Sequence, residues 1–156
     1  MENENWSKSC ILAANRHNKN DDYLVLSPKQ FRLHISDLEQ SGYGINSCVT
    51  LFDGSIRHIP MIDFHIGKSK INEDIVCTVC KSLIPDGGYI IDSGNSYHFI
   101  GKKLITTSQL LTLLAKSILF TPIVDEIWVA HQIIERSCTL RIGLKNGLLP
   151  TLIRTI

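Results

Sequence analysis

The chain has 156 residues, the length of one ordinary domain rather than of two large ones. Hydrophobic residues make up 44% and charged residues 20% of the sequence. This is enough apolar side chain to bury a core, which excludes a disordered chain. The net charge of +1 argues against a polybasic protein that coats nucleic acid or a membrane surface, although a local basic groove stays open.

Targeting signals and cysteine usage both indicate a soluble protein of the cytoplasm, without a membrane partner. No apolar run reaches the roughly 18 residues that a membrane span needs, and residues 1–5 are polar and acidic, unlike a signal peptide. The five cysteines are odd in number and irregularly spaced, which fits reduced thiols better than a disulfide framework. We expect residues 1–21 to be a partly ordered lead-in and residues 22–156 to form a single domain.

The first expected elements are a strand, a helix and a second strand. Residues 23–26 form a short apolar run that is typical of a buried strand. Ser27 is expected to cap a helix with Pro28 in its first position, and apolar residues at helical spacing extend this helix to about Gln40. Residues 46–52 are rich in β-branched and apolar side chains and are expected to form the next strand.

A hairpin and a second helix follow. Asp53-Gly54 is a turn signal that predicts a hairpin into a strand over residues 56–66, in which Pro60 indicates an edge position or a bulge. Residues 69–83 show one apolar face at helical spacing. The same predicted helix contains Cys77-x-x-Cys80. Because no second cysteine pair exists to complete a zinc site, buried structural cysteines are favoured over a redox or metal role.

The second half is expected to hold one more helix among further strands. Thr106 or Thr107 is predicted to cap the helix, and Pro122 ends it. The predicted strands are residues 89–91, 97–100, 126–134 and 139–144. This alternation of hairpins and helices predicts an α+β fold, with helices packed on one face of a mainly antiparallel sheet.

Asp63 and His65 are the first candidate site residues. In a strand, positions i and i+2 share a face, so Asp63 and His65 are expected to point the same way. An acid beside an imidazole can hold a divalent cation or act as an acid–base pair. The alternative is that this face of the strand meets solvent.

The turn after residue 92 is the second candidate. Ser93-Gly94-Asn95 leads into a strand on which Ser96 and His98 share a face. Small residues let backbone amides approach an anion, and the hydroxyl and imidazole groups can donate to phosphate oxygens. The alternative is a tight turn followed by an amphipathic edge strand.

His131 and Arg141 come from the last predicted strands. His131 alternates with apolar residues, as expected on one face of a strand. Arg141, between Leu140 and Ile142, either points outward or clamps a phosphate by bidentate donation.

Taken in order, these features resemble the archaeo-eukaryotic primase superfamily, which includes the primase-polymerases. The family's strand motif of two acids separated by one residue looks like Asp63-Phe64-His65, with His in the second place. Its phosphate-binding Ser-x-His strand after a Ser-Gly turn is similar to residues 93–98. Its third motif, an Asp near a strand followed by Leu-Arg-Ile, resembles Leu140-Arg141-Ile142 with His131 in place of the acid, and Asp125 is another candidate for that acid. The resemblance spans about residues 45–150.

The resemblance implies a fold, a partner and a set of roles. It implies an α+β catalytic core with a sheet like that of the RNA-recognition motif, and a nucleotide or nucleic acid as partner. The implied catalytic residues, which are also the ligands of a divalent metal, are Asp63, His65 and His131. The implied phosphate-binding residues are Ser93, Ser96, His98 and Arg141. Because imidazole suits Mn²⁺ or Zn²⁺ better than Mg²⁺, the metal's identity among these three stays open.

Three functions therefore remain. The chain is a primase-like nucleotidyltransferase with altered metal use, a non-catalytic module that binds a nucleotide or RNA, or a protein-interaction module unrelated to primases. Convergence of Asp63, His65, His98 and His131 in one pocket would favour the first two, and dispersal would favour the third. Candidates for a local basic patch are Lys102, Lys103, Arg136, Arg141 and Lys145.

Overall fold

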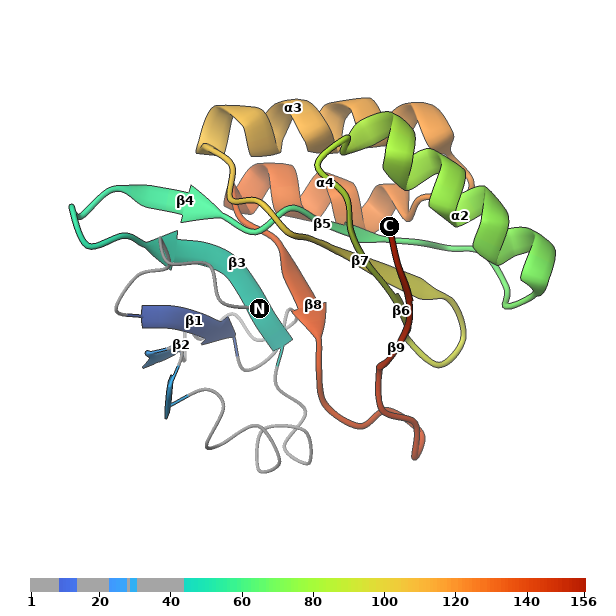
Figure 1. Cartoon of the computed structure of the whole chain (residues 1–156), viewed down its shortest axis with the longest axis horizontal. Helices are drawn as coiled ribbons and strands as arrows, with labels where there is room; N and C mark the ends of the chain where they lie inside the picture. Colours follow the sequence, from blue (N-terminus) through green and yellow to red (C-terminus); the bar gives the residue numbers. More distant parts are fainter. Residues whose placement is uncertain (1–8, 14–22, 28, 31–43) are drawn as a thin grey trace.

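In the computed structural model, the residues described are 9–13, 23–27, 29–30 and 44–156. The described strands form two antiparallel sheets, and a layer of helices lies above them (Figure 1). The helices are α2 (Lys70–Leu83), α3 (Thr107–Ser117) with a 3₁₀ turn η1 (Ile118–Phe120), and α4 (Glu126–Glu135). The chain is thus a mixed α+β structure, as predicted.

The first sheet has the strand order β2-β1-β3-β4, and β8 also pairs with β3. Its strands are β1 (Ser9–Ala13), β2 (Tyr23–Leu26), β3 (Gly44–Thr50), β4 (Ile56–His58) and β8 (Thr139–Arg141). The second sheet has the order β5-β7-β6-β9. Its strands are β5 (Met61–Asp63), β6 (Gly88–Asp92), β7 (Tyr97–Gly101) and β9 (Thr151–Thr155). One mainly antiparallel sheet was expected; the strands are instead divided between two.

The division falls at Pro60, inside the strand predicted over residues 56–66. The chain leaves β4 at His58 and enters β5 at Met61, so one predicted strand becomes two strands in different sheets. Proline cannot donate a ladder hydrogen bond, and here its carbonyl instead accepts from the amide of Gly101 at 2.7 Å. A Cβ at Gly101 would lie 2.8 Å from the Pro60 ring, so the close approach of the two chains requires glycine.

The strand predicted over residues 126–134 is wrong, because this segment is helix α4. Asp125 caps the helix by accepting the amide of Trp128 at 2.8 Å. Trp128, Val129 and Gln132 are buried, which is helical spacing, whereas Ile134 is 78% exposed. The β-branched residues favoured a strand, but the cap and the burial of one helical face decide the structure.

The other helix predictions are confirmed where the structure describes them. Ser69 caps α2 by accepting from Asn72 N, and Thr106 caps α3 in a reciprocal capping box with Gln109. Ser27 Oγ accepts from Gln30 N at 3.3 Å, as expected of a cap, although residues 31–40 of that predicted helix lie outside the described residues.

Four further findings bear on the sequence predictions. Residues 9–13 of the expected lead-in form β1, while the remainder of residues 1–21 lies outside the described residues. Strand β9 was not predicted. Cys77 and Cys80 are both buried on α2, and burial raises the pKa of the Cys80 thiol far above its ordinary value, with the neighbouring Cys77 adding to the shift. None of the described helices is long and apolar enough to span a membrane.

The second sheet has two faces that differ in their surroundings. Ile62, Phe99, Ile90 and Arg154 are opposite one another across its four strands, so their side chains share one face. Arg154 contacts Glu73 at 2.6 Å and Asp74 at 2.9 Å on α2. This face is therefore the one that the helices cover, and its apolar members are fully buried.

The opposite face carries the row Asp63, His98, Ile91 and Leu152, which are likewise opposite one another in register. His98 is buried, Ile91 is half-buried and Leu152 is 61% exposed. Burial thus decreases from the centre of the sheet toward β9. We call the side that carries this row the open face.

Candidate functional site

An acid and an imidazole meet on the open face. Asp63 ends β5 directly opposite His98 on β7, and Asp63 Oδ1 lies 3.5 Å from His98 Nε2. Their side chains are 16% and 8% exposed. The pairing of the two strands, rather than closeness in the sequence, brings the two groups together.

Arg141 adds a cation beside this pair. Its guanidinium is partly buried, which lowers the pKa of Arg141, while the negative charge of Asp63 opposes that shift. It donates to the backbone carbonyls of Ser93 and Gly143, and at 3.3 Å to that of Leu148. Arg141 therefore ties the turn between β6 and β7 to the segment that leads to β9, and it brings a positive charge close to Asp63.

The Ser-Gly turn makes several of its own hydrogen bonds. Ser96 Oγ donates to the Phe64 carbonyl at 2.6 Å and accepts from Ile66 N at 3.1 Å. The amide of Ser93 donates to the Ser96 carbonyl, and the amide of Gly94 donates to Asp92 Oδ1 at 2.7 Å. The Ser96 hydroxyl thus holds the chain after β5 against β7, and the two amides close the turn itself. These are the groups that we expected to face an anion.

His65 and His131 occupy different surroundings. His131 is exposed on helix α4 rather than on a strand. His65 is exposed just beyond β5, where its backbone amide donates to the Ile123 carbonyl at 2.8 Å. Asp125, the other candidate acid, caps α4.

The expected metal ligands are not gathered into one site. Within the described part of the chain, no three His, Cys, Asp or Glu side chains lie close enough to hold a metal ion. The donor set on the open face is one carboxylate and one imidazole, with a guanidinium nearby. This set does not fit a metal held by protein ligands alone.

Arg141 has a structural partner that was not predicted from the sequence. That partner is the segment over residues 143–150, in which Asn146 and Gly147 have φ of 53° and 76° and the backbones of Lys145 and Leu148 bond to each other. Leu148 also packs 3.3 Å from the Cβ position of Gly94. Asn-Gly is a signal for such a tight turn, so this return of the chain was detectable.

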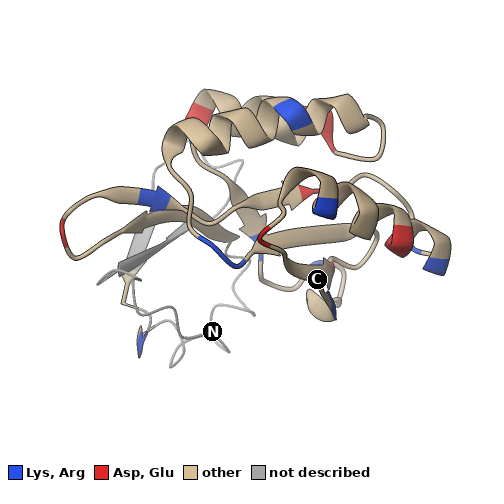
Figure 2. Cartoon of the chain, turned by 45° about the horizontal axis from the view of Figure 1, so that its top comes forward, with Lys and Arg blue, Asp and Glu red and all other residues tan. Residues whose placement is uncertain are grey.

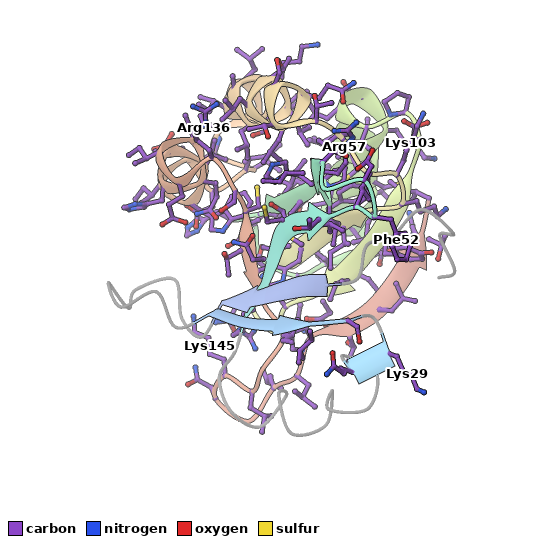
Figure 3. All side chains as sticks on the ribbon, turned by 90° about the vertical axis from the view of Figure 1, so that its left-hand side faces the viewer. Lys29, Phe52, Arg57, Lys103, Arg136 and Lys145 are labelled. Atoms are coloured by element: carbon purple, nitrogen blue, oxygen red, sulfur yellow. The ribbon has the colours of Figure 1, made fainter. Side chains whose placement is uncertain are left out.

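The candidate basic residues do not form one patch. Figure 3 shows Lys103, Arg136 and Lys145 at three separate places on the outline of the molecule. Figure 2 shows basic and acidic segments interspersed over the described ribbon. Arg141 is the member of that predicted patch that lies beside Asp63.

Comparison with known proteins supplies the family. A search of curated proteins and a search of solved structures each found no match. The family model described as "archaeo-eukaryotic primase 1D-like" matches residues 26–151. This range includes the two sequence motifs on the open face and the segment that Arg141 holds. The chain therefore belongs to the archaeo-eukaryotic primase 1D-like family.

Proposed function

We propose that the chain is a primase-like domain that binds a nucleotide, or the phosphate end of a nucleic acid strand, on the open face. The observation that carries the proposal is the juxtaposition of His98 with Asp63 at 3.5 Å, with the charge of the Arg141 guanidinium interacting with that of Asp63. Protonated imidazole and guanidinium are both strong donors to phosphate oxygens.

Each side chain of the site has a separate role in the proposed binding. His98 Nε2, which lies 3.5 Å from Asp63 Oδ1 without a ligand, turns its N–H to a phosphate oxygen when the ligand binds. Three hydrogen bonds from Arg141 serve carbonyl groups of described residues, so a phosphate bound by Arg141 uses its remaining N–H groups. Ser96 acts as a positioning residue, because its hydroxyl bridges Phe64 and Ile66, and Ser93 contributes through the carbonyl that Arg141 holds.

Asp63 orients the His98 imidazole before the ligand binds. It also offers one carboxylate to a divalent cation that arrives with the phosphates, as Mg²⁺ commonly does. His65 and His131 are exposed and belong to no group of three metal-ligating side chains in the described part of the chain, so Asp63 is the metal ligand that this proposal uses. Nucleotide binding without efficient transfer is therefore the function that this site supports best.

The second candidate is nucleotidyl transfer with Mn²⁺ or Zn²⁺ in place of Mg²⁺. It is favoured by one observation, the imidazole that lies beside the carboxylate of Asp63, because imidazole is a good ligand for these softer metals. An assay with each metal in turn separates this candidate from binding alone.

The proposal is tested by calorimetric titration with ribonucleoside and deoxyribonucleoside triphosphates and with inorganic tripolyphosphate. We expect His98→Gln to weaken binding of all of them by about tenfold or more, because a hydrogen bond to a charged group is worth roughly 1.5–3 kcal/mol. The matched control is His131→Gln, an exposed histidine on α4, which should bind as the parent does. A parent chain that binds none of these ligands would refute the proposal, as would equal affinities for parent and His98→Gln.

A further inference from the structure

The row that begins with Asp63 and His98 continues into an apolar surface. Ile91 is opposite His98, and Leu152 is opposite Ile91, so the side chains of all three share the open face. Neighbouring strands lie about 4.8 Å apart, which places Leu152 roughly 10 Å from His98 along the row. The row thus runs from His98, the proposed phosphate-binding group, to the apolar side chain of Leu152.

The fold does not require the Leu152 side chain to be exposed. Its side chain is 61% exposed, although it lies on a paired strand beside the half-buried Ile91. The helix face of the same sheet shows the contrast, since Ile90 and Phe99 are fully buried there. Leu152 and Ile91 therefore present apolar surface to solvent next to the proposed phosphate site.

A bulge in β9 and the segment before it produce this apolar surface. Ile153 is an extra residue in β9, because the register shifts between Ile90 and Ile91. This bulge lets Arg154 point to α2 while Leu152 points to the open face. Arg141 fixes the preceding segment through the Leu148 carbonyl at 3.3 Å, so the cation beside the phosphate site and the apolar surface are connected by one short piece of chain.

We propose that Ile91 and Leu152 form the subsite for the sugar and base of the nucleotide whose phosphate lies at His98. This inference rests on the proposed function and adds to it the part of the ligand that β9 contacts. The base of a nucleotide is flat and apolar on its faces, and it lies beyond the phosphate by a distance comparable to two strand spacings. Burial of Leu152 and Ile91 under it removes apolar surface from water.

The same surface predicts weak discrimination among bases. Leu152 and Ile91 carry no hydrogen-bonding group on their side chains, so they contact the face of a ring rather than read its edge. We expect purine nucleotides to bind more tightly than pyrimidine nucleotides, because the larger ring covers more apolar area.

The test compares two ligands on two variants. Leu152→Ala and the matched control Ile71→Ala, an isoleucine 74% exposed on α2, are titrated with a purine nucleoside triphosphate and with inorganic tripolyphosphate. We expect Leu152→Ala to weaken nucleotide binding about tenfold, on the scale of a few buried methylene groups, and to leave tripolyphosphate binding unchanged. Ile71→Ala should leave both unchanged.

The outcomes separate this inference from the proposed function. Nucleotide affinity that is unchanged in Leu152→Ala, or an equal loss for nucleotide and tripolyphosphate, would overturn the subsite while the phosphate site at His98 stands. A parent chain that binds neither ligand would overturn both. Because Leu152 is mostly exposed, its truncation leaves the folded core intact, and circular dichroism of each variant verifies this.

Discussion

His58 is a buried histidine whose charged form the fold disfavours. Its ring lies between two hydroxyl groups, with Nδ1 3.1 Å from Ser47 Oγ and Nε2 3.0 Å from Thr107 Oγ1. The Ser47 hydroxyl also accepts from the amide of Cys138 at 2.9 Å. His58 therefore joins β4, β3 and the start of α3 through one ring, and its burial lowers its pKa.

A pH dependence of stability follows from His58. The unfolded chain takes up a proton on this ring as the pH falls through about 6.5, whereas the folded chain does so only at a lower pH. The unfolded state thus binds more protons in this window, so the free energy of unfolding should fall as the pH drops from about 7 to about 5. Urea unfolding at both pH values measures this, and a slope that is the same in His58→Gln as in the parent would contradict it.

At the same scale, some site residues were predictable and others were not. Asp63 and His98 were identified as candidate site residues because each lies in a short motif on an apolar strand. The bonding of Ser96 to Phe64 and Ile66 was not predictable, since these groups are about thirty residues apart and only the pairing of β5 with β7 brings them together. A hydroxyl in a motif can serve the fold as readily as a ligand.

At the scale of the elements, the stability of helix α3 depends on a cap that can be recognised in the sequence. Thr106 Oγ1 accepts from Gln109 N at 3.2 Å, and Gln109 Oε1 accepts from Thr106 N at 2.8 Å. We expect Thr106→Ala to lower the free energy of unfolding by about 1 kcal/mol. Chemical denaturation measures the loss, and Ser108→Ala, an exposed change in the first turn, is the control. Equal stability of the two variants would show that the capping box contributes nothing.

The elements also show where sequence reasoning fails. The helix α2 was predicted from its apolar spacing, and α3 was predicted with Thr106 or Thr107 as its cap, because in both segments the local signals agree. For α4 they disagree, since isoleucine and valine favour a strand while Asp125 and the burial of Trp128 and Gln132 favour a helix. Strand β9 was not predicted because its five residues follow a turn and show no alternating pattern of burial. The pattern is lost because a bulge shifts the register of the strand.

For the whole molecule, two sheets rather than one determine what the site can do. The division at Pro60 sends β4 and β5 into different sheets, and Asp63 ends the second of these strands on the open face. The helices cover the opposite face, through contacts such as those of Arg154 with α2. The proposed ligand site is therefore on the side of the four-stranded sheet away from the helices.

We expect weak or no Mg²⁺-dependent polymerisation by the isolated chain. Two-metal nucleotidyl transfer requires several carboxylates that hold two ions roughly 3.5–4 Å apart. Among the described residues placed on the open face, Asp63 is the single carboxylate. Incubation with template, primer, labelled nucleotides and Mg²⁺ tests this, with a parallel series in Mn²⁺. Robust extension with Mg²⁺ that Asp63→Ala abolishes would show that the chain completes a two-metal site.

The central claim is that the open face of the second sheet binds a nucleotide by its phosphates. The most direct measurement is a titration of the isotopically labelled chain with a purine nucleoside triphosphate, followed by amide chemical shifts. The account predicts shifts in β5, in β7, in the turn at Ser93 to Ser96 and around Leu152, with little change along α2 and α4. Shifts confined to the helices, or none at saturating ligand, would contradict it.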